Sequence, residues 1–184
     1  MVVSNNKKLT EKVRSLRNLA FRNDRRFYHT EIGYNYRLTN MQAAIGISQI
    51  ENLKKHIKIK RTNTNFYNKI LNEMSLPLRL PLEKNNVMSV YWMYGIIIEN
   101  KTFNAKFLAT KLWEQGIETR PLFLGMHQQP IFKKMNLFKN EKYPVTEELA
   151  EYGLYLPSGL KLKKKDIIRV CKTVKKIFNE NKKK

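Results

Sequence analysis

Cysteine, glycine and acidic residues are scarce in this sequence, and each shortage bears on which classes of protein are possible. A single cysteine in 184 residues, Cys171, excludes an internal disulfide framework and is typical of a reducing cytosol. Only seven glycines, together with 42% hydrophobic and 11% aromatic residues, argue against wholesale disorder and allow a buried core. The opening residues have neither the charged-then-apolar order of a signal peptide nor a run long enough to cross a bilayer. We therefore expect a soluble, cytoplasmic protein with no membrane partner.

Acidic residues are outnumbered: 15 Asp and Glu face 36 Lys and Arg, which gives a formal net charge of +21. Such an excess can indicate a polyanionic partner, whose phosphates would bind the cations in a salt-dependent way. It can equally be solvated surface charge. The sequence has no basic stripe interleaved with aromatic residues and no zinc-finger spacing, which favours surface charge. We expect no nucleic-acid partner, and a basic nucleic-acid-binding protein remains an alternative function.

The clearest local signal in the chain is a helix start at Thr39. Thr39 and Gln42 form a capping-box pattern, in which the Thr39 hydroxyl accepts from the Gln42 amide and the Gln42 side chain reaches back. The helical pattern behind this cap has a broad apolar face and continues, with room for a bend, until Pro77 ends it. Upstream, the spacing of apolar residues predicts an edge strand at 1–5, a helix at 7–19 and a loop at 21–36.

After Pro77 strands and helices alternate, which predicts a compact α+β unit. The β-branched and aromatic run at 90–98 is typical of a buried strand. The next helix is expected to be capped by Thr102 and closed by Gly116. The elements predicted in this part are strands at 90–98, 117–122 and 155–157 and helices at 103–115, 146–152 and 163–179.

Two short segments carry the residues with chemical potential. Asn35 and Arg37 lie just ahead of the Thr39 cap, where an amide, a guanidinium and free helix N–H groups can together bind an anion. Alternatively, Asn35 occupies a turn and Arg37 pairs with a surface acid. In the second segment, Arg120 presents a cation beside Pro121, and His127 is a hydrogen-bonding or acid–base group unless it is simply a structural histidine. No histidine has companions at metal-ligand spacing, so we expect no metal site.

As a set, these segments resemble the DegT/StrS-type sugar aminotransferases. The resemblance is carried in order by GYNYRLTNMQAAIG at 33–46, GIETRPLF at 116–123, MHQQP at 126–130 and LYLPSG at 154–159. The variant FLGMH at 123–127 looks most like the perosamine synthase branch of the family, whose members serve polysaccharide biosynthesis. The match runs from Met1 to about Phe178, which is nearly the whole chain.

The resemblance implies the C-terminal portion of a fold-type-I pyridoxal-phosphate aminotransferase, an α/β protein that forms a homodimer with active sites at the subunit interface. Residues 1–55 would end the large cofactor-binding domain and supply an interface segment, and residues 56–184 would form the small α+β domain. Asn35 is similar to the residue that reaches across the dimer to the phosphate of pyridoxal 5'-phosphate. Arg37, His127 and Arg120 are the candidates for substrate binding.

The implied reaction moves an amino group from glutamate to a 4-keto-6-deoxy nucleotide sugar, and the perosamine-like segment favours a GDP-linked sugar. In such enzymes the lysine that forms the Schiff base with the cofactor lies in the half that precedes these motifs. None of the lysines here has that context, so this chain has no catalytic residue of that kind. We expect this chain to be part of an enzyme and to be inactive without the N-terminal half. Alternatively, the chain is a non-catalytic remnant of such an enzyme.

Overall fold

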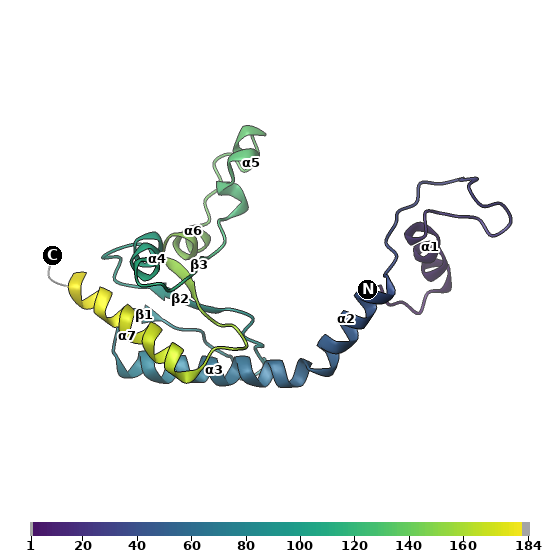
Figure 1. The fold of residues 1–184 in the computed structure, drawn as a ribbon. Coiled ribbons are helices and arrows are strands. Elements are labelled where there is room, and N and C mark those ends of the chain that lie inside the picture. The colour runs from purple at the N-terminus through teal and green to yellow at the C-terminus, as the bar shows by residue number, and fades with distance from the viewer. Residues whose placement is uncertain (1, 182–184) are drawn as a thin grey trace. The chain divides into compact units, whose positions relative to one another are not determined.

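The computed structural model describes residues 2–181 and divides into two compact units, one ending at Leu53 and the other beginning at Lys54. The helices and strands are shown in Figure 1. In chain order they are α1 (Lys7–Arg17), α2 (Asn40–Glu51), α3 (Leu53–Glu73), β1 (Leu78–Arg79), β2 (Tyr94–Ile98), α4 (Ala105–Glu114), β3 (Arg120–Pro121), the 3₁₀ turn η1 (Met126–Gln128), α5 (Pro130–Lys134), α6 (Pro144–Tyr152), β4 (Gly153–Leu156) and α7 (Lys164–Asn181).

The first unit contains two helices joined by a long irregular segment. The predicted capping box is present at α2: the Gln42 amide donates to Thr39 Oγ1 at 3.2 Å, and the Thr39 amide donates to Gln42 Oε1 at 2.9 Å. The loop expected at 21–36 is confirmed as irregular. The predicted strand at 1–5 is wrong for the described residues 2–5: Val3 is 85% exposed, and no neighbouring strand pairs with this segment. Met1 lies outside the described residues.

The second unit is built on a four-stranded antiparallel sheet in the order β1-β2-β4-β3. The central strand β2 alternates buried and half-buried positions, so Tyr94, Ile96 and Ile98 point to one face. That face packs against α3, α4 and α7, which Figure 1 shows beside the sheet. The inward positions predicted for the last helix are confirmed, because the following residues of α7 are buried: Ile167, Val170, Val174 and Ile177.

The structure departs from the sequence-based elements in a few places. The expected strand at 90–98 begins only at Tyr94, because Tyr91 has a left-handed backbone (φ 45°) that a β-ladder does not accommodate. Helix α4 is capped by Asn104, whose Oδ1 accepts from the Phe107 amide at 3.0 Å, and not by Thr102. Gly116 follows α4 with φ +68°, as a closing glycine should.

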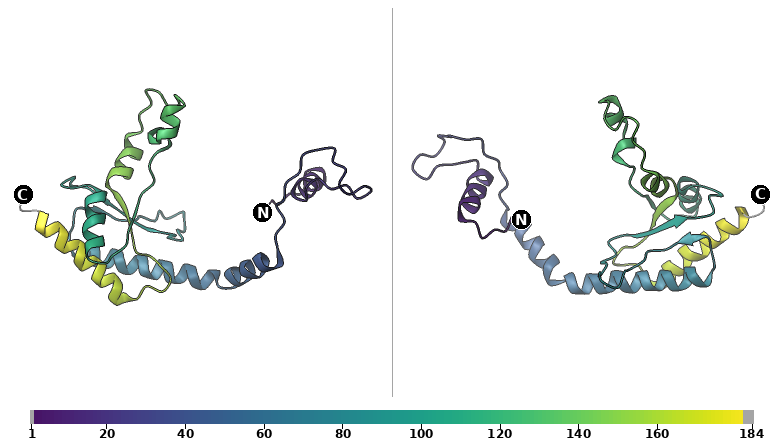
Figure 2. Two further views of the ribbon diagram at one scale, coloured as in Figure 1. Left: turned by 45° about the horizontal axis from the view of Figure 1, so that its top comes forward. Right: turned by 180° about the vertical axis from the view of Figure 1, so that it is seen from behind.

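The short elements β1 and α5 were not expected from the sequence. In both views of Figure 2 the segment that carries η1 and α5 extends away from the sheet of the second unit. Within residues 2–181, none of the helices combines the length and the apolar character needed to span a bilayer.

Candidate functional site

The segment that carries Asn35 and Arg37 is held against the end of α1 by backbone hydrogen bonds. The Leu19 amide donates to the Tyr34 carbonyl at 3.0 Å, and the Tyr36 amide donates to the Arg17 carbonyl at 3.0 Å. These bonds form an isolated antiparallel bridge between Asn18 and Asn35. Because the backbone on both sides of Asn35 is fixed in this way, its amide side chain, which is exposed, is presented at a defined position.

Gly33 allows the two segments joined by this bridge to approach each other closely. A Cβ atom added at Gly33 would lie 2.2 Å from the backbone nitrogen of Ala20, a distance that no side chain could occupy. Ala20 itself is buried, and its backbone has the left-handed conformation with φ 51°. The glycine in the GYNYR motif therefore has a direct packing reason, since only glycine lets the two chain segments approach to this distance.

Arg37 is positioned by two contacts from the same unit. Its Nε donates to Asn18 Oδ1 at 2.6 Å, and its guanidinium lies 5.6 Å from the centroid of the Phe21 ring. Arg37 lines a cleft of about 980 Å³ that also contains Arg14, Arg17 and Arg22. An exposed guanidinium held by an amide and an aromatic face keeps its remaining N–H groups available to an anion.

Two of the three acidic residues that line this cleft, Asp24 and Glu31, are already partnered. Glu31 accepts from Lys12 and, at 2.9 Å, from Ser15 Oγ, and these bonds, Lys12 first, lower the pKa of Glu31 below its usual value. Asp24 pairs with Arg22 at 2.6 Å, and this hydrogen bond lowers the pKa of Asp24. The alternative role considered for Arg37, a surface ion pair, is not what the structure shows, because among the described residues its hydrogen-bond partner is the neutral Asn18.

The second unit contains a cleft of about 680 Å³ at the end of the sheet, and Arg120 lines it. Arg120 is exposed on the edge strand β3, where its backbone pairs with Tyr155 of β4. Trp92 and Tyr155 are the aromatic residues of the wall. Lys60 of α3 also lines the cleft, and its Nζ donates to the carbonyls of Trp92 at 2.9 Å and Ser158 at 2.5 Å. Partial burial lowers the pKa of Lys60.

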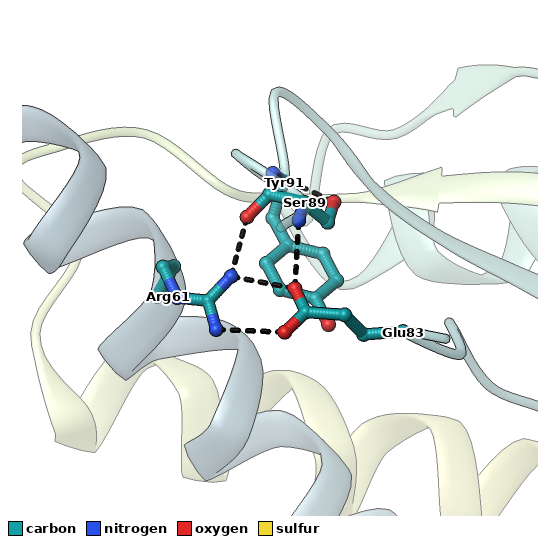
Figure 3. Close-up of polar contacts among 4 residues, drawn as sticks. All are labelled: Arg61, Glu83, Ser89 and Tyr91. Atoms are coloured by element: carbon teal, nitrogen blue, oxygen red, sulfur yellow. Dashed lines mark hydrogen bonds and ion pairs between the residues drawn. The ribbon is translucent and has the colours of Figure 1, made fainter. Parts of the chain in front are cut away.

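One helical position further along, Arg61 makes a bidentate ion pair with Glu83, as Figure 3 shows. The two N···O distances are 2.5 and 2.8 Å, and the guanidinium also donates to the Ser89 carbonyl at 2.6 Å. The Ser89 amide donates in turn to Glu83 at 2.7 Å. The Arg61 contact, followed by the Ser89 amide, lowers the pKa of Glu83 to about 2. Arg61 also lies 5.6 Å from the Tyr91 ring centroid.

His127 lies in η1 and is held by α6. Its Nε2 is 3.0 Å from Glu147 Oε1, its ring centroid is 4.9 Å from that of Tyr143, and its side chain is only 9% exposed. The Tyr143 amide and then His127 lower the pKa of Glu147. These contacts are those of a satisfied structural histidine, so a substrate contact would have to use the other ring nitrogen, Nδ1.

The four predicted site residues therefore fall into separate groups. Asn35 and Arg37 lie on one segment of the first unit, as the sequence motif required. Arg120 and His127 both belong to the second unit but line different depressions, of about 680 and 440 Å³. Sequence reasoning missed Lys60, Trp92 and the Arg61–Glu83 pair, because their contacts join positions far apart in the chain and no local motif announces them.

Comparison with known proteins places these sites in context. The model of the DegT/DnrJ/EryC1/StrS aminotransferase family matches residues 1–175. The GDP-perosamine synthase of Escherichia coli O157:H7 is 32% identical over 180 residues, which cover 98% of this chain and 47% of that protein. The GDP-perosamine synthase of Vibrio cholerae is also 32% identical, over 97% of this chain and 48% of that protein. The chain spans about half the length of these relatives, corresponding to their C-terminal half.

Solved structures confirm the expected fold class. Helicobacter pylori PseC, an aminotransferase involved in the biosynthesis of pseudoaminic acid, superposes with a TM-score of 0.83 at 22% identity, over 97% of this chain and 48% of that chain. DesV of S. venezuelae gives a TM-score of 0.79 at 24% identity, over 95% and 45% of the two chains. At this level of identity the likeness concerns the fold: an α/β arrangement that makes up about half of an aminotransferase.

Proposed function

Because the chain belongs to the DegT/DnrJ/EryC1/StrS aminotransferase family, we propose that it forms the C-terminal half of a pyridoxal-phosphate-dependent sugar aminotransferase. The enzyme would move an amino group from glutamate to a 4-keto-6-deoxy sugar carried on a nucleotide, GDP by the similarity to perosamine synthases. The proposal depends most on the GYNYR segment, whose exposed Asn35 and Arg37 are held by backbone pairing in the context that the family match covers.

The donor chemistry of this segment fits the phosphate of pyridoxal 5'-phosphate. An exposed carboxamide and an exposed guanidinium two residues apart offer neutral and charged N–H donors, which a phosphate dianion accepts. Neither side chain is tied to an acid: Arg37 donates to the neutral Asn18. Asn35 is therefore the residue that would hold the phosphate, and Arg37 beside it would bind an anionic group of the substrate, while the cofactor, when bound, supplies the electron sink for amino transfer.

The second unit would supply contacts on the substrate side. Arg120 presents an exposed cation at the edge of the sheet, suited to an anionic substrate group. His127, oriented by Glu147 through Nε2, would accept a hydrogen bond from a substrate hydroxyl with Nδ1. Residues 1–55 would act as the end of the cofactor-binding domain and residues 56–184 as the small domain.

We further propose that the lysine that binds the cofactor and the aspartate that faces its pyridine nitrogen come from the other half of the enzyme. The chain matches slightly less than half of each relative, so a complete site requires that complement, either in a homodimer of full-length chains or in a pair of halves. The enzyme would work in the cytoplasm, where nucleotide sugars and glutamate are available.

The test is reconstitution with the amino-terminal half of the Escherichia coli GDP-perosamine synthase. The pair is expected to retain pyridoxal phosphate, seen by its visible absorption after gel filtration, and to transfer the amino group of glutamate. Asn35→Ala should weaken cofactor retention about ten- to a hundredfold, because one hydrogen bond to a charged group is lost. Asn5→Ala, an exposed amide of the first unit outside the cleft that Arg37 lines, is the control and should leave retention unchanged.

Two outcomes would contradict the proposal. Equal cofactor retention by the wild-type and Asn35→Ala pairs would show that Asn35 does not hold the phosphate. A pair that assembles and retains the cofactor but transfers no amino group to any 4-keto nucleotide sugar would favour the alternative of a non-catalytic remnant.

A further inference from the structure

The cleft of the second unit presents an exposed aromatic side chain. Trp92 is 67% exposed although tryptophan is one of the side chains that gains most from burial. It lines the cleft together with Tyr155 and Arg120. We propose that this cleft binds the nucleoside diphosphate part of the sugar nucleotide, with the base stacked on Trp92 and a phosphate paired with Arg120. The inference rests on the proposed function and locates one part of its substrate.

Two consecutive residues of α3, Lys60 and Arg61, fix the backbone of the wall that carries Trp92. Lys60 binds the Trp92 carbonyl and also the Ser158 carbonyl across the cleft wall. Arg61 binds Glu83 and the Ser89 carbonyl, so the loop before Trp92 is clamped as well, as Figure 3 shows. Between these clamps Tyr91 keeps a left-handed backbone with φ 45°, which costs free energy unless its surroundings impose it. The backbone that carries the indole is therefore fixed before any ligand arrives, which lowers the cost of ordering the wall on binding.

The charges of the cleft suit an anionic ligand. Three cations line it, Lys60, Arg120 and Arg169, against two acids, Glu118 and Asp166. Lys60 and Arg169 are occupied, because they donate to backbone carbonyls, and the Asp166 Oδ2 accepts from the Lys163 amide at 3.0 Å. Among the described residues of the cleft, Arg120 is therefore the cation that remains available to a ligand. Within residues 2–181 Arg120 has no ion-pair partner.

Size and surface chemistry together select the ligand class. A volume of about 680 Å³ is within the range of clefts that enclose small molecules and is large enough for a nucleotide. An exposed indole stacks on the flat face of any base, and an unpaired guanidinium binds phosphate oxygens in a bidentate way. A free amino acid would use the cation but leave the indole uncovered, and an apolar ligand would leave the guanidinium unpaired. A nucleoside diphosphate uses both.

The chain offers a matched pair of probes for this proposal. Its two tryptophans, Trp92 and Trp113, are 67% and 68% exposed, and only Trp92 lines the cleft. In the full chain with Trp113→Phe, GDP should quench the remaining indole, guanosine should quench it at higher concentration, and inorganic phosphate should not. In the chain with Trp92→Phe, GDP should leave the fluorescence of Trp113 unchanged. Absence of quenching in the Trp113→Phe chain, or equal quenching in both variants, would overturn the proposal.

Calorimetry with GDP measures the two contacts separately. Trp92→Ala should weaken binding by at least about fivefold, the usual worth of one stacked base, while Trp113→Ala leaves it unchanged. Arg120→Gln should weaken GDP binding about tenfold and leave guanosine binding unaffected, with Arg79→Gln, away from the cleft, as control. If circular dichroism shows that Trp92→Ala has lost folded structure, the fluorescence comparison of Trp113→Phe with Trp92→Phe tests the proposal instead.

The two proposals fail in distinguishable ways. A reconstituted pair that transfers amino groups, combined with a Trp113→Phe chain that GDP does not quench, would refute the nucleotide cleft and leave the enzyme function standing. Quenching of Trp92 by GDP, combined with a reconstituted pair that retains no pyridoxal phosphate, would support the cleft and refute the enzyme function.

Discussion

Removing the hydroxyl of Tyr67 tests how α3 is joined to the loop that follows β4. Tyr67 is fully buried, its hydroxyl donates to the Pro157 carbonyl at 2.9 Å, and its ring stacks on Tyr94 with centroids 4.4 Å apart. Tyr67→Phe keeps the ring and the stack, so only the hydrogen bond is lost. The expected loss of stability is about 1 kcal/mol, rising to about 3 kcal/mol if water does not reach the Pro157 carbonyl.

Equilibrium unfolding in urea, followed by circular dichroism, measures this difference. Burial raises the pKa of Tyr67, so the hydroxyl stays protonated and can donate at any pH suited to the experiment. Tyr28→Phe, at an exposed ring of the first unit, is the control and should change stability by less than about 0.5 kcal/mol. Unfolding midpoints that coincide for the Tyr67→Phe and wild-type chains would refute the reasoning, because the contact would then carry no net stability.

Two further predictions follow from titratable groups of the second unit. The pKa of Glu83 is about 2 in the folded chain against an ordinary 4.5, so its contribution is complete above pH 4.5 and is lost as the pH falls toward 2. Glu83→Gln should flatten the acid limb of the stability–pH curve measured by urea unfolding; an unchanged limb would contradict this. Burial raises the pKa of Cys171 to about 12, so a thiol reagent at neutral pH should label it only on unfolding, and immediate labelling would contradict this.

Local chemistry made part of this fold predictable from sequence. The Thr39–Gln42 capping box needs only four consecutive residues, and it appears with both of its hydrogen bonds. The inward face of α7 follows from the 3.6-residue period, and all four predicted positions are buried. Where two local signals competed, the prediction failed: Thr102 and Asn104 are both good caps, and the helix begins at the second because its Oδ1 reaches the Phe107 amide.

Interactions between distant segments were out of reach of the sequence. Lys60 and Ser158 are 98 positions apart, and Arg61 and Glu83 are 22 apart, so no spacing rule connects them. The late start of β2 has the same cause: the residues before Tyr94 have the composition of a strand, but Lys60 and Arg61 hold their backbone elsewhere. For the candidate site, the motif located Asn35 and Arg37 on one segment, whereas the cleft around Arg120 emerged only when four chain segments came together.

The two units differ in what holds them together, and this bears on how the proposed site would assemble. In residues 2–53 Ala20 is the only buried residue, whereas the second unit contains a continuous core that includes Tyr94, Leu108 and Phe178. The apolar side chains of α2, such as Ile45 and Ile50, are exposed. A segment without a core gains its order from contacts that cover its apolar face. Asn35 and Arg37 are held locally by the bridge to α1, but the apolar face of α2 would be covered only in the complete proposed enzyme, whereas the cleft around Trp92 is built by the second unit alone.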